Sequence, residues 1–184
     1  MGGRGPREDL GRAAWRGGVI VDLKTVIDTA IAPALALLPA NRDTREARVM
    51  LLAIGLQESR FLHRRQIGGP ARGFWQFEQG GGVRGVLRHP SSRDLAYAVC
   101  AEREVAATAR DVYNTLEHDD VLAAAFARLL LWTDFQRLPS LGDTEGAWAL
   151  YLRTWRPGRP HPGTWAALYA RALAAVGAGN VRMG

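Results

Sequence analysis

The chain has 184 residues, of which 47% are hydrophobic and 23% are charged, a balance typical of one soluble globular domain with a proper core. Its single cysteine excludes an internal disulfide framework and a cysteine-rich metal cluster. The net charge of +6 suits a polyanionic partner, but the sequence has no nucleic-acid-binding motif and no dense basic run, so we expect no nucleic-acid partner.

The first 20 residues predict a flexible arm, because their mixture of Gly, Arg and Pro cannot support a core. This segment lacks the apolar stretch of a secretory signal, so we expect the protein to be made in the cytoplasm without a signal peptide. No run of about 18 apolar residues occurs, which predicts no membrane span. We expect one domain over residues 21–184.

Helical periods dominate from Asp22 onward, and signals for strands are nearly absent. The first predicted helix starts at Asp22, and Pro33 and Pro39 bracket or bend its end. The second starts at Asp43 or Thr44, both good N-caps, and runs to residue 59. Between residues 66 and 82, two glycine-rich turns (68–70 and 79–82) flank a short aromatic segment, which predicts a loop or a very short strand.

Four more helices are predicted in the second half of the chain. They span residues 92–113, then 121–135 behind two aspartates, then a segment that follows Asp143 or Thr144 and ends before Pro157, and finally a segment from about 164 to near 177. The predicted fold class is therefore mainly α.

Glu58 lies at the end of the second predicted helix, which is apolar on all sides. Ala47, Leu51 and Ile54 share its face, so the helix is expected to be buried. Burial would raise the pKa of the Glu58 carboxyl, and a carboxyl that keeps its proton near neutral pH can serve as general acid toward a glycosidic oxygen. Periodicity alone favours the other interpretation, a solvated side chain at the helix end paired with Arg60 or Arg64, because charges near helix ends are common.

A short motif surrounds this acid. The chain reads Glu-Ser-x-Phe from residue 58 and Gly-Phe-Trp-Gln from residue 73. This pattern, at the end of an apolar helix, resembles the lytic transglycosylase and goose-type lysozyme superfamily. The resemblance implies a lysozyme-like helical domain in which Glu58 is the sole essential acid/base. It also implies that Ser59 and Gln76 lie in the cleft and help to hold the acid and the substrate.

The sequence departs from that family at two places. Glu78 stands where the family often carries methionine, and the family's Tyr-Asn-Ala-Gly motif has no match in the corresponding region, 148–158. Tyr151 or Trp155 could fill the aromatic role there. The aromatic run suggests a cleft floor on which sugar rings stack, which adds Trp75 and Phe77 to the candidate substrate-binding residues, although Phe77 equally fits the core.

Glu78 leaves two mechanisms open. With Glu58 alone, the 6-hydroxyl of the muramoyl residue closes onto the anomeric carbon and leaves a 1,6-anhydromuramic end. With a second carboxylate at about 6.5–9.5 Å, a water is activated and the bond is hydrolysed with inversion. Glu78 is the only acid of the motif loop that could take this second role, and it equally fits a surface carboxylate paired with Arg84.

The sequence and the resemblance together predict a muramidase that cleaves the β-1,4 bond between N-acetylmuramic acid and N-acetylglucosamine in peptidoglycan strands. A lytic transglycosylase is the first choice. No metal or cofactor is predicted, since the four histidines lack metal-ligand spacing. The small size is typical of a phage lysin or virion-associated enzyme, which would reach the cell wall by holin release or on the virion and could bind virion components. The rival hypothesis is a non-catalytic phage structural or wall-binding module of the same fold.

Overall fold

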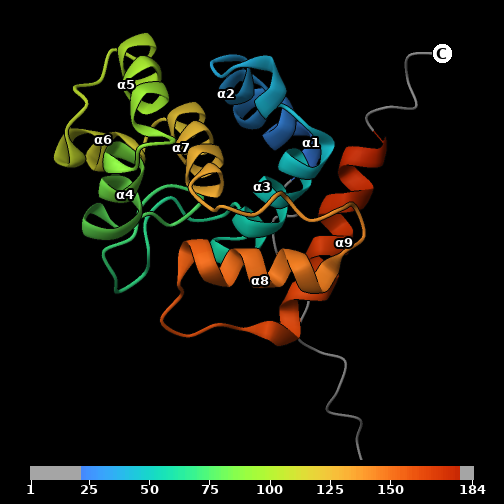
Figure 1. The fold of residues 1–184 in the computed structure, drawn as a ribbon. Helices are drawn as coiled ribbons and strands as arrows, with labels where there is room; N and C mark the ends of the chain where they lie inside the picture. The colour runs from blue at the N-terminus through green and yellow to red at the C-terminus, as the bar shows by residue number, and fades with distance from the viewer. Residues whose placement is uncertain (1–21, 179–184) are drawn as a thin grey trace, which may run out of the picture.

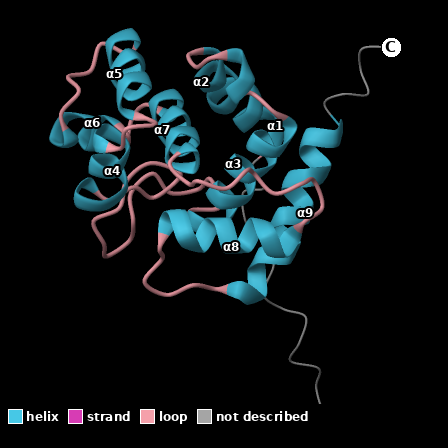
Figure 2. Cartoon of the chain, in the orientation of Figure 1, coloured by secondary structure: helices cyan, strands magenta, loops and turns pink. Residues whose placement is uncertain are grey.

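The computed structural model describes residues 22–178, and in this range the chain consists of helices and loops without a strand (Figure 2). The predicted mainly α class is confirmed. The elements in chain order are α1 (Leu23–Val26), η1 (Ile27–Ile31), α2 (Ala32–Ala36), η2 (Ala40–Arg42), α3 (Arg45–Glu58), η3 (Gln79–Val83), α4 (Arg84–Arg88), α5 (Arg93–Glu102), α6 (Ala109–Thr115), α7 (Asp120–Trp132), α8 (Thr144–Trp155) and α9 (Pro162–Ala178). The arm predicted over residues 1–20 lies outside the described residues.

Helix α3 lies at the centre of the fold (Figure 1). Its residues 49–56 are all buried, as its apolar sequence predicts. It packs mainly against α9 and also contacts α7 and η1, while α8 packs against α9 and α7. Helices α4, α5, α6 and α7 form the other part of the molecule. None of the helices in residues 22–178 is long and apolar enough to cross a membrane.

Side-chain caps fix the starts of the helices that carry the site. The N-cap side chains accept hydrogen bonds from backbone amides at 3.2 Å for Thr44 of α3, 2.9 Å for Asp119 of α7 and 2.8 Å for Asp143 of α8. Each such cap contributes about 1 kcal/mol. These starts agree with the sequence prediction, whereas α7 ends at Trp132 rather than at residue 135 and α9 begins at Pro162.

The first predicted helix forms as α1, η1 and α2 in direct succession. Its middle part, η1, is a π-helix, in which the backbone N–H of Ala32 donates to the carbonyl of Ile27. Pro33 follows directly and has no N–H to donate, so the wider turn accommodates the proline inside the helical segment. Pro33 therefore lies within the helical segment, and Pro39 follows it.

The predicted single helix over residues 92–113 is wrong. Helix α5 ends at Glu102, and α6 begins at Ala109. The chain breaks because Glu104 takes a left-handed backbone conformation with φ of 53° and because Thr108 caps a new helix by accepting from the Asp111 N–H at 3.1 Å.

The predicted turn at residues 79–82 is also wrong, because this segment forms the π-helix η3 and continues into α4, which the sequence did not indicate. The N–H of Val83 donates to the carbonyl of Glu78 at 3.2 Å. Gly82 faces the ring of Phe77 so closely that an added Cβ would lie 2.7 Å from it. Gly82 therefore allows η3 and the aromatic loop to approach each other.

Candidate active site

A groove of about 1380 Å³ opens beside the C-terminal end of α3. Its walls come from the end of α3, the loop that follows it, η3, α4, residues 130–135 at the end of α7, the second half of α8 and the segment that follows α8. The structure brings six of the predicted site residues to its lining: Glu58, Gln76, Phe77, Glu78, Tyr151 and Trp155. Ser59 and Trp75 are not among the lining residues.

Glu58 is the last residue of α3, and its side chain is half-buried at the groove. Its Oε1 accepts a hydrogen bond of 2.6 Å from the hydroxyl of Tyr151. Burial raises the pKa of the Glu58 carboxyl to about 7, against the lowering effect of that hydrogen bond. Arg64 pairs with Asp120 instead, at 2.6 Å, and Glu58 forms no ion pair within residues 22–178. At neutral pH a large fraction of Glu58 therefore carries a proton.

Tyr151 is held in place by a stack of aromatic rings from α8 and α9. Its ring lies 5.3 Å from that of Trp165 at an interplanar angle of 15°, and the rings of Trp148 and Trp155 follow at 5.2 Å and 6.4 Å. The side chain is 3% exposed. Burial and the nearby Glu58 raise the pKa of the phenol, so Tyr151 stays protonated and donates to the carboxyl.

The chain reverses direction immediately after Glu58. Arg60 and Phe61 both take left-handed backbone conformations with φ of 57°, and the Phe61 ring folds back onto Gly55 of α3. Two such non-glycine residues in succession are strained unless their surroundings hold them. Edge-to-face packing of Phe61 against Phe74 at 5.4 Å and against Trp75 at 5.8 Å supplies that support.

Ser59 joins the end of α3 to the aromatic loop. Its hydroxyl donates to the carbonyl of Phe74 at 2.7 Å and accepts from the N–H of Phe61 at 3.1 Å. The side chain is buried and does not reach the groove lining. In this position Ser59 holds the end of the helix that carries Glu58, which is one half of its expected role. It does not line the groove, so the other half, contact with a ligand, is not met.

Trp75 is 0% exposed, so the expectation that it offers a surface for sugar stacking needs correction. Its indole N–H donates to the carbonyl of Leu51 at 2.8 Å, which anchors the loop to α3 from behind. The indole N–H of Trp155 donates to the Trp75 carbonyl at 2.9 Å and so ties α8 to the same loop. Phe77 meets Trp155 at 5.9 Å and is also buried, at the groove wall.

Gln76 lies at the groove in a left-handed conformation with φ of 50°. Its side-chain amide donates to the Gly73 carbonyl at 2.8 Å, which closes a tight turn. A non-glycine residue in this conformation is common at functional sites, where the surrounding structure enforces it. Gln76 thus lines the same groove as Glu58 and is held there by its own turn.

Gln57 is a groove residue that the sequence did not single out. Its amide nitrogen donates to the carbonyl of His161 at 3.2 Å, and its amide oxygen accepts from the hydroxyl of Thr164 at 3.0 Å. These bonds connect the residue next to Glu58 with the segment that enters α9. No local signal in the sequence marks such a contact between residues more than 100 positions apart.

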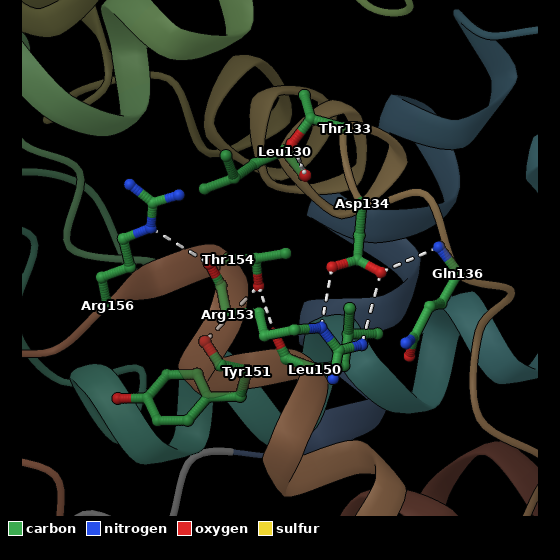
Figure 3. A network of polar contacts seen from close by, with 9 residues as sticks. All are labelled: Leu130, Thr133, Asp134, Gln136, Leu150, Tyr151, Arg153, Thr154 and Arg156. Carbon is green, nitrogen blue, oxygen red and sulfur yellow. Dashed lines mark hydrogen bonds and ion pairs between the residues drawn. The ribbon is translucent and has the colours of Figure 1, made fainter.

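An ion pair on the far wall of the groove was missed as well (Figure 3). Arg153 of α8 donates to Asp134 at 2.9 Å, and the N–H of Gln136 donates to the same carboxylate at 3.0 Å. Burial raises the pKa of Asp134, but the hydrogen bonds from Arg153 and Gln136 and the positive charge of Arg153 together outweigh this effect, and the net shift is downward. This network fixes the turn that presents Phe135, which lines the groove and is 89% exposed.

Replacing Tyr151 with phenylalanine should raise the pKa of Glu58 further above 7. The ring stack is kept, whereas the hydrogen bond that stabilises the ionised carboxyl is lost. An activity that needs protonated Glu58 falls as the pH rises through this pKa, so its alkaline limb should move to higher pH in the variant. The pKa can be read from the pH dependence of the Glu58 carboxyl signal in NMR spectra. An unchanged or lower value would contradict the assigned hydrogen bond.

Comparisons of the chain with protein-family models, with curated proteins and with solved structures found no match. Within residues 22–178, no group of three or more His, Cys, Asp or Glu side chains is arranged to hold a metal ion. The chemistry of the groove therefore rests on its own residues. Its main feature is the half-buried carboxyl of Glu58, with the hydroxyl of Tyr151 as hydrogen-bond donor beside it.

Proposed function

We propose that this protein is a peptidoglycan-cleaving muramidase with Glu58 as its general acid/base, acting on the β-1,4 bond between N-acetylmuramic acid and N-acetylglucosamine. The observation that carries the proposal is the state of Glu58: it lies at a groove and its pKa of about 7 lets it hold a proton at neutral pH. General acid catalysis is most efficient when the pKa lies near the working pH.

The preferred mechanism is that of a lytic transglycosylase. Glu58 donates its proton to the glycosidic oxygen as the bond from that oxygen to the anomeric carbon of the muramoyl residue breaks. The 6-hydroxyl oxygen of the same residue then bonds to the anomeric carbon, and its proton passes to the Glu58 carboxylate. The product is a 1,6-anhydromuramic end, no water is consumed, and the acid is regenerated.

The proposal includes a lysozyme-like fold and a phage origin. A mainly helical chain in which a largely buried central helix ends on the acid supports the first part. The motif from Glu58 to Gln76 supports both by resemblance to transglycosylases and goose-type lysozymes. Under this proposal the protein is a lysin or a virion-associated enzyme that another component delivers to the cell wall.

An inverting hydrolase is the second candidate, and the position of Glu78 favours it. The side chain is exposed, lines the same groove as Glu58 and forms no ion pair with Arg84. A carboxylate without an ion-pair partner among residues 22–178 could activate a water in the groove, as inverting glycosidases require.

Product masses separate these candidates. Purified peptidoglycan is incubated with the protein, and the released muropeptides are analysed by mass spectrometry. Anhydromuramic ends support the transglycosylase, and reducing ends support the hydrolase, since the two differ by one water. Release of no soluble product would contradict both and leave the wall-binding module of the same fold.

Glu78→Gln should leave the product masses and the rate of release nearly unchanged if the transglycosylase mechanism holds. In the hydrolase mechanism the same change removes the general base and should slow release by about 10²–10⁴-fold. Glu102→Gln is the matched control, because Glu102 is an exposed acid at the end of α5 outside the groove. A large loss in Glu78→Gln but not in Glu102→Gln would contradict the transglycosylase mechanism.

A further inference from the structure

The segment between α8 and α9 places two arginines without acidic partners on the groove. Arg156 and Arg159 both line it, both are exposed, and neither forms an ion pair with any residue in 22–178. Arg153, by contrast, is neutralised by Asp134. No aspartate or glutamate occurs anywhere in the sequence after Glu145, so the segment itself contributes positive charges and no negative ones to the groove.

The segment is held in a defined shape. Arg156 ends α8 in a left-handed conformation with φ of 49°, and its Nε donates to the Arg153 carbonyl at 3.3 Å. In Figure 3 its guanidinium lies beside Leu130, apart from the ion pair of Asp134 and Arg153. Pro157 and Pro160 restrict the backbone on both sides of Arg159, and the bond from Gln57 fixes the far end at His161. The two cations are thus attached to a pre-organised wall.

The hydroxyl and acetamido groups of the sugar chain are neutral, and the lactyl carboxyl of a muramoyl residue is consumed in the amide bond to its peptide, so these cations need a carboxylate from another part of the substrate. In peptidoglycan the muramoyl residues carry peptides, and those peptides carry carboxylates. Arginine is the residue best suited to bind carboxylates, because its planar guanidinium forms two parallel charge-assisted hydrogen bonds.

We propose that Arg156 and Arg159 bind a carboxylate of the peptide attached to the glycan strand, so that the groove recognises peptide-bearing rather than bare glycan. This inference rests on the proposed function, and it names the part of the substrate that the segment at residues 156–161 contacts.

Binding tests the proposal separately from cleavage. Soluble glycan fragments free of teichoic acid are prepared with their peptides and, after amidase treatment, without them. The peptide-free fragment keeps a lactyl carboxylate on each muramoyl residue, so it also controls for binding of the two arginines to that group. Their dissociation constants are measured by calorimetry for the Glu58→Gln protein, which should not turn them over. The same protein carrying Arg156→Gln and Arg159→Gln should bind the peptide-bearing fragment about tenfold or more weakly, as expected for lost hydrogen bonds to a charged group. It should bind the bare fragment equally well.

The control is a protein with Arg137→Gln and Arg171→Gln, since both residues are exposed, lie outside the groove lining and remove the same charge. It should bind both fragments like the parent. Equal weakening for both fragments, or equal weakening by the control pair, would overturn the inference. Peptide-dependent binding without any cleavage by the wild-type protein would instead contradict the proposed enzyme and keep the binding role of the two arginines.

Discussion

Replacing Glu58 with glutamine should slow the release of soluble products from peptidoglycan by about 10²–10⁴-fold, the contribution typical of a positioned general acid. Glutamine keeps the size of the side chain and can still accept the hydrogen bond from Tyr151, but it has no proton of suitable acidity for the leaving oxygen. Initial rates measured by mass spectrometry of released muropeptides provide the test. Equal rates for both proteins would remove Glu58 from the mechanism.

The same substitution should make the fold more stable, and the gain should grow with pH. The folded-state pKa of Glu58 is raised from 4.5 to about 7, so ionisation of the buried carboxyl costs stability. This cost is absent below the unfolded pKa, increases as the pH rises and is complete above the folded pKa. Each pKa unit corresponds to about 1.4 kcal/mol, which gives a cost on the order of 3 kcal/mol at pH 8.

Urea unfolding of the wild type and of Glu58→Gln at pH 5 and pH 8 measures this difference. The free-energy advantage of the variant should be small at pH 5 and on the order of 2 kcal/mol larger at pH 8. A stable but inactive variant also excludes unfolding as the cause of lost activity. An advantage that does not change with pH would contradict the burial of the carboxyl.

Gly55→Ala should destabilise the protein by about 1–3 kcal/mol or more, the cost of inserting a methyl group into a close-packed core. A Cβ at residue 55 would lie 2.2 Å from the ring of Phe61. The ring cannot move away easily, because Phe74 and Trp75 pack against its other sides and the backbone at Phe61 is left-handed. Urea or thermal unfolding measures the loss.

Gly85→Ala in α4 is the matched control. An added Cβ at residue 85 meets nothing within 4 Å, and this helical glycine is exposed. Its replacement should leave stability unchanged or raise it by up to about 1 kcal/mol through helix propensity. If Gly55→Ala were as harmless as this control, Phe61 would not be the side chain that packs against α3.

The sequence was informative wherever one local segment decides the outcome. The burial of the helix that ends at Glu58 could be predicted because every residue from Val49 to Leu56 is apolar, and residues 49–56 are indeed buried. The starts of α3 and α8 could be predicted because Thr44 and Asp143 are strong caps. Periodicity failed between α5 and α6, where the left-handed conformation of one residue has no signature in the sequence.

Long-range contacts could not be predicted. Tyr151 and Trp155 were equally good candidates for the aromatic role, because both lie on the same amphipathic helix. Only the packing of α8 on the rest of the fold gives Tyr151 the bond to Glu58 and gives Trp155 a bond to the backbone of Trp75. The exposure of an aromatic residue such as Trp75 likewise depends on which elements cover it.

The hydrogen bonds that complete the site span most of the chain: 93 residues separate Glu58 from Tyr151, and 107 separate Gln57 from Thr164. Contacts of such high sequence separation form late in folding, because a long loop must close first. During synthesis, α3 leaves the ribosome well before α8 and α9 exist, and Glu58 is then an ordinary hydrated carboxyl. Its pKa rises only when α8 and α9 dock and bury the carboxyl. At neutral pH, Glu58 is therefore ionised on the nascent chain and takes up a proton as the fold is completed.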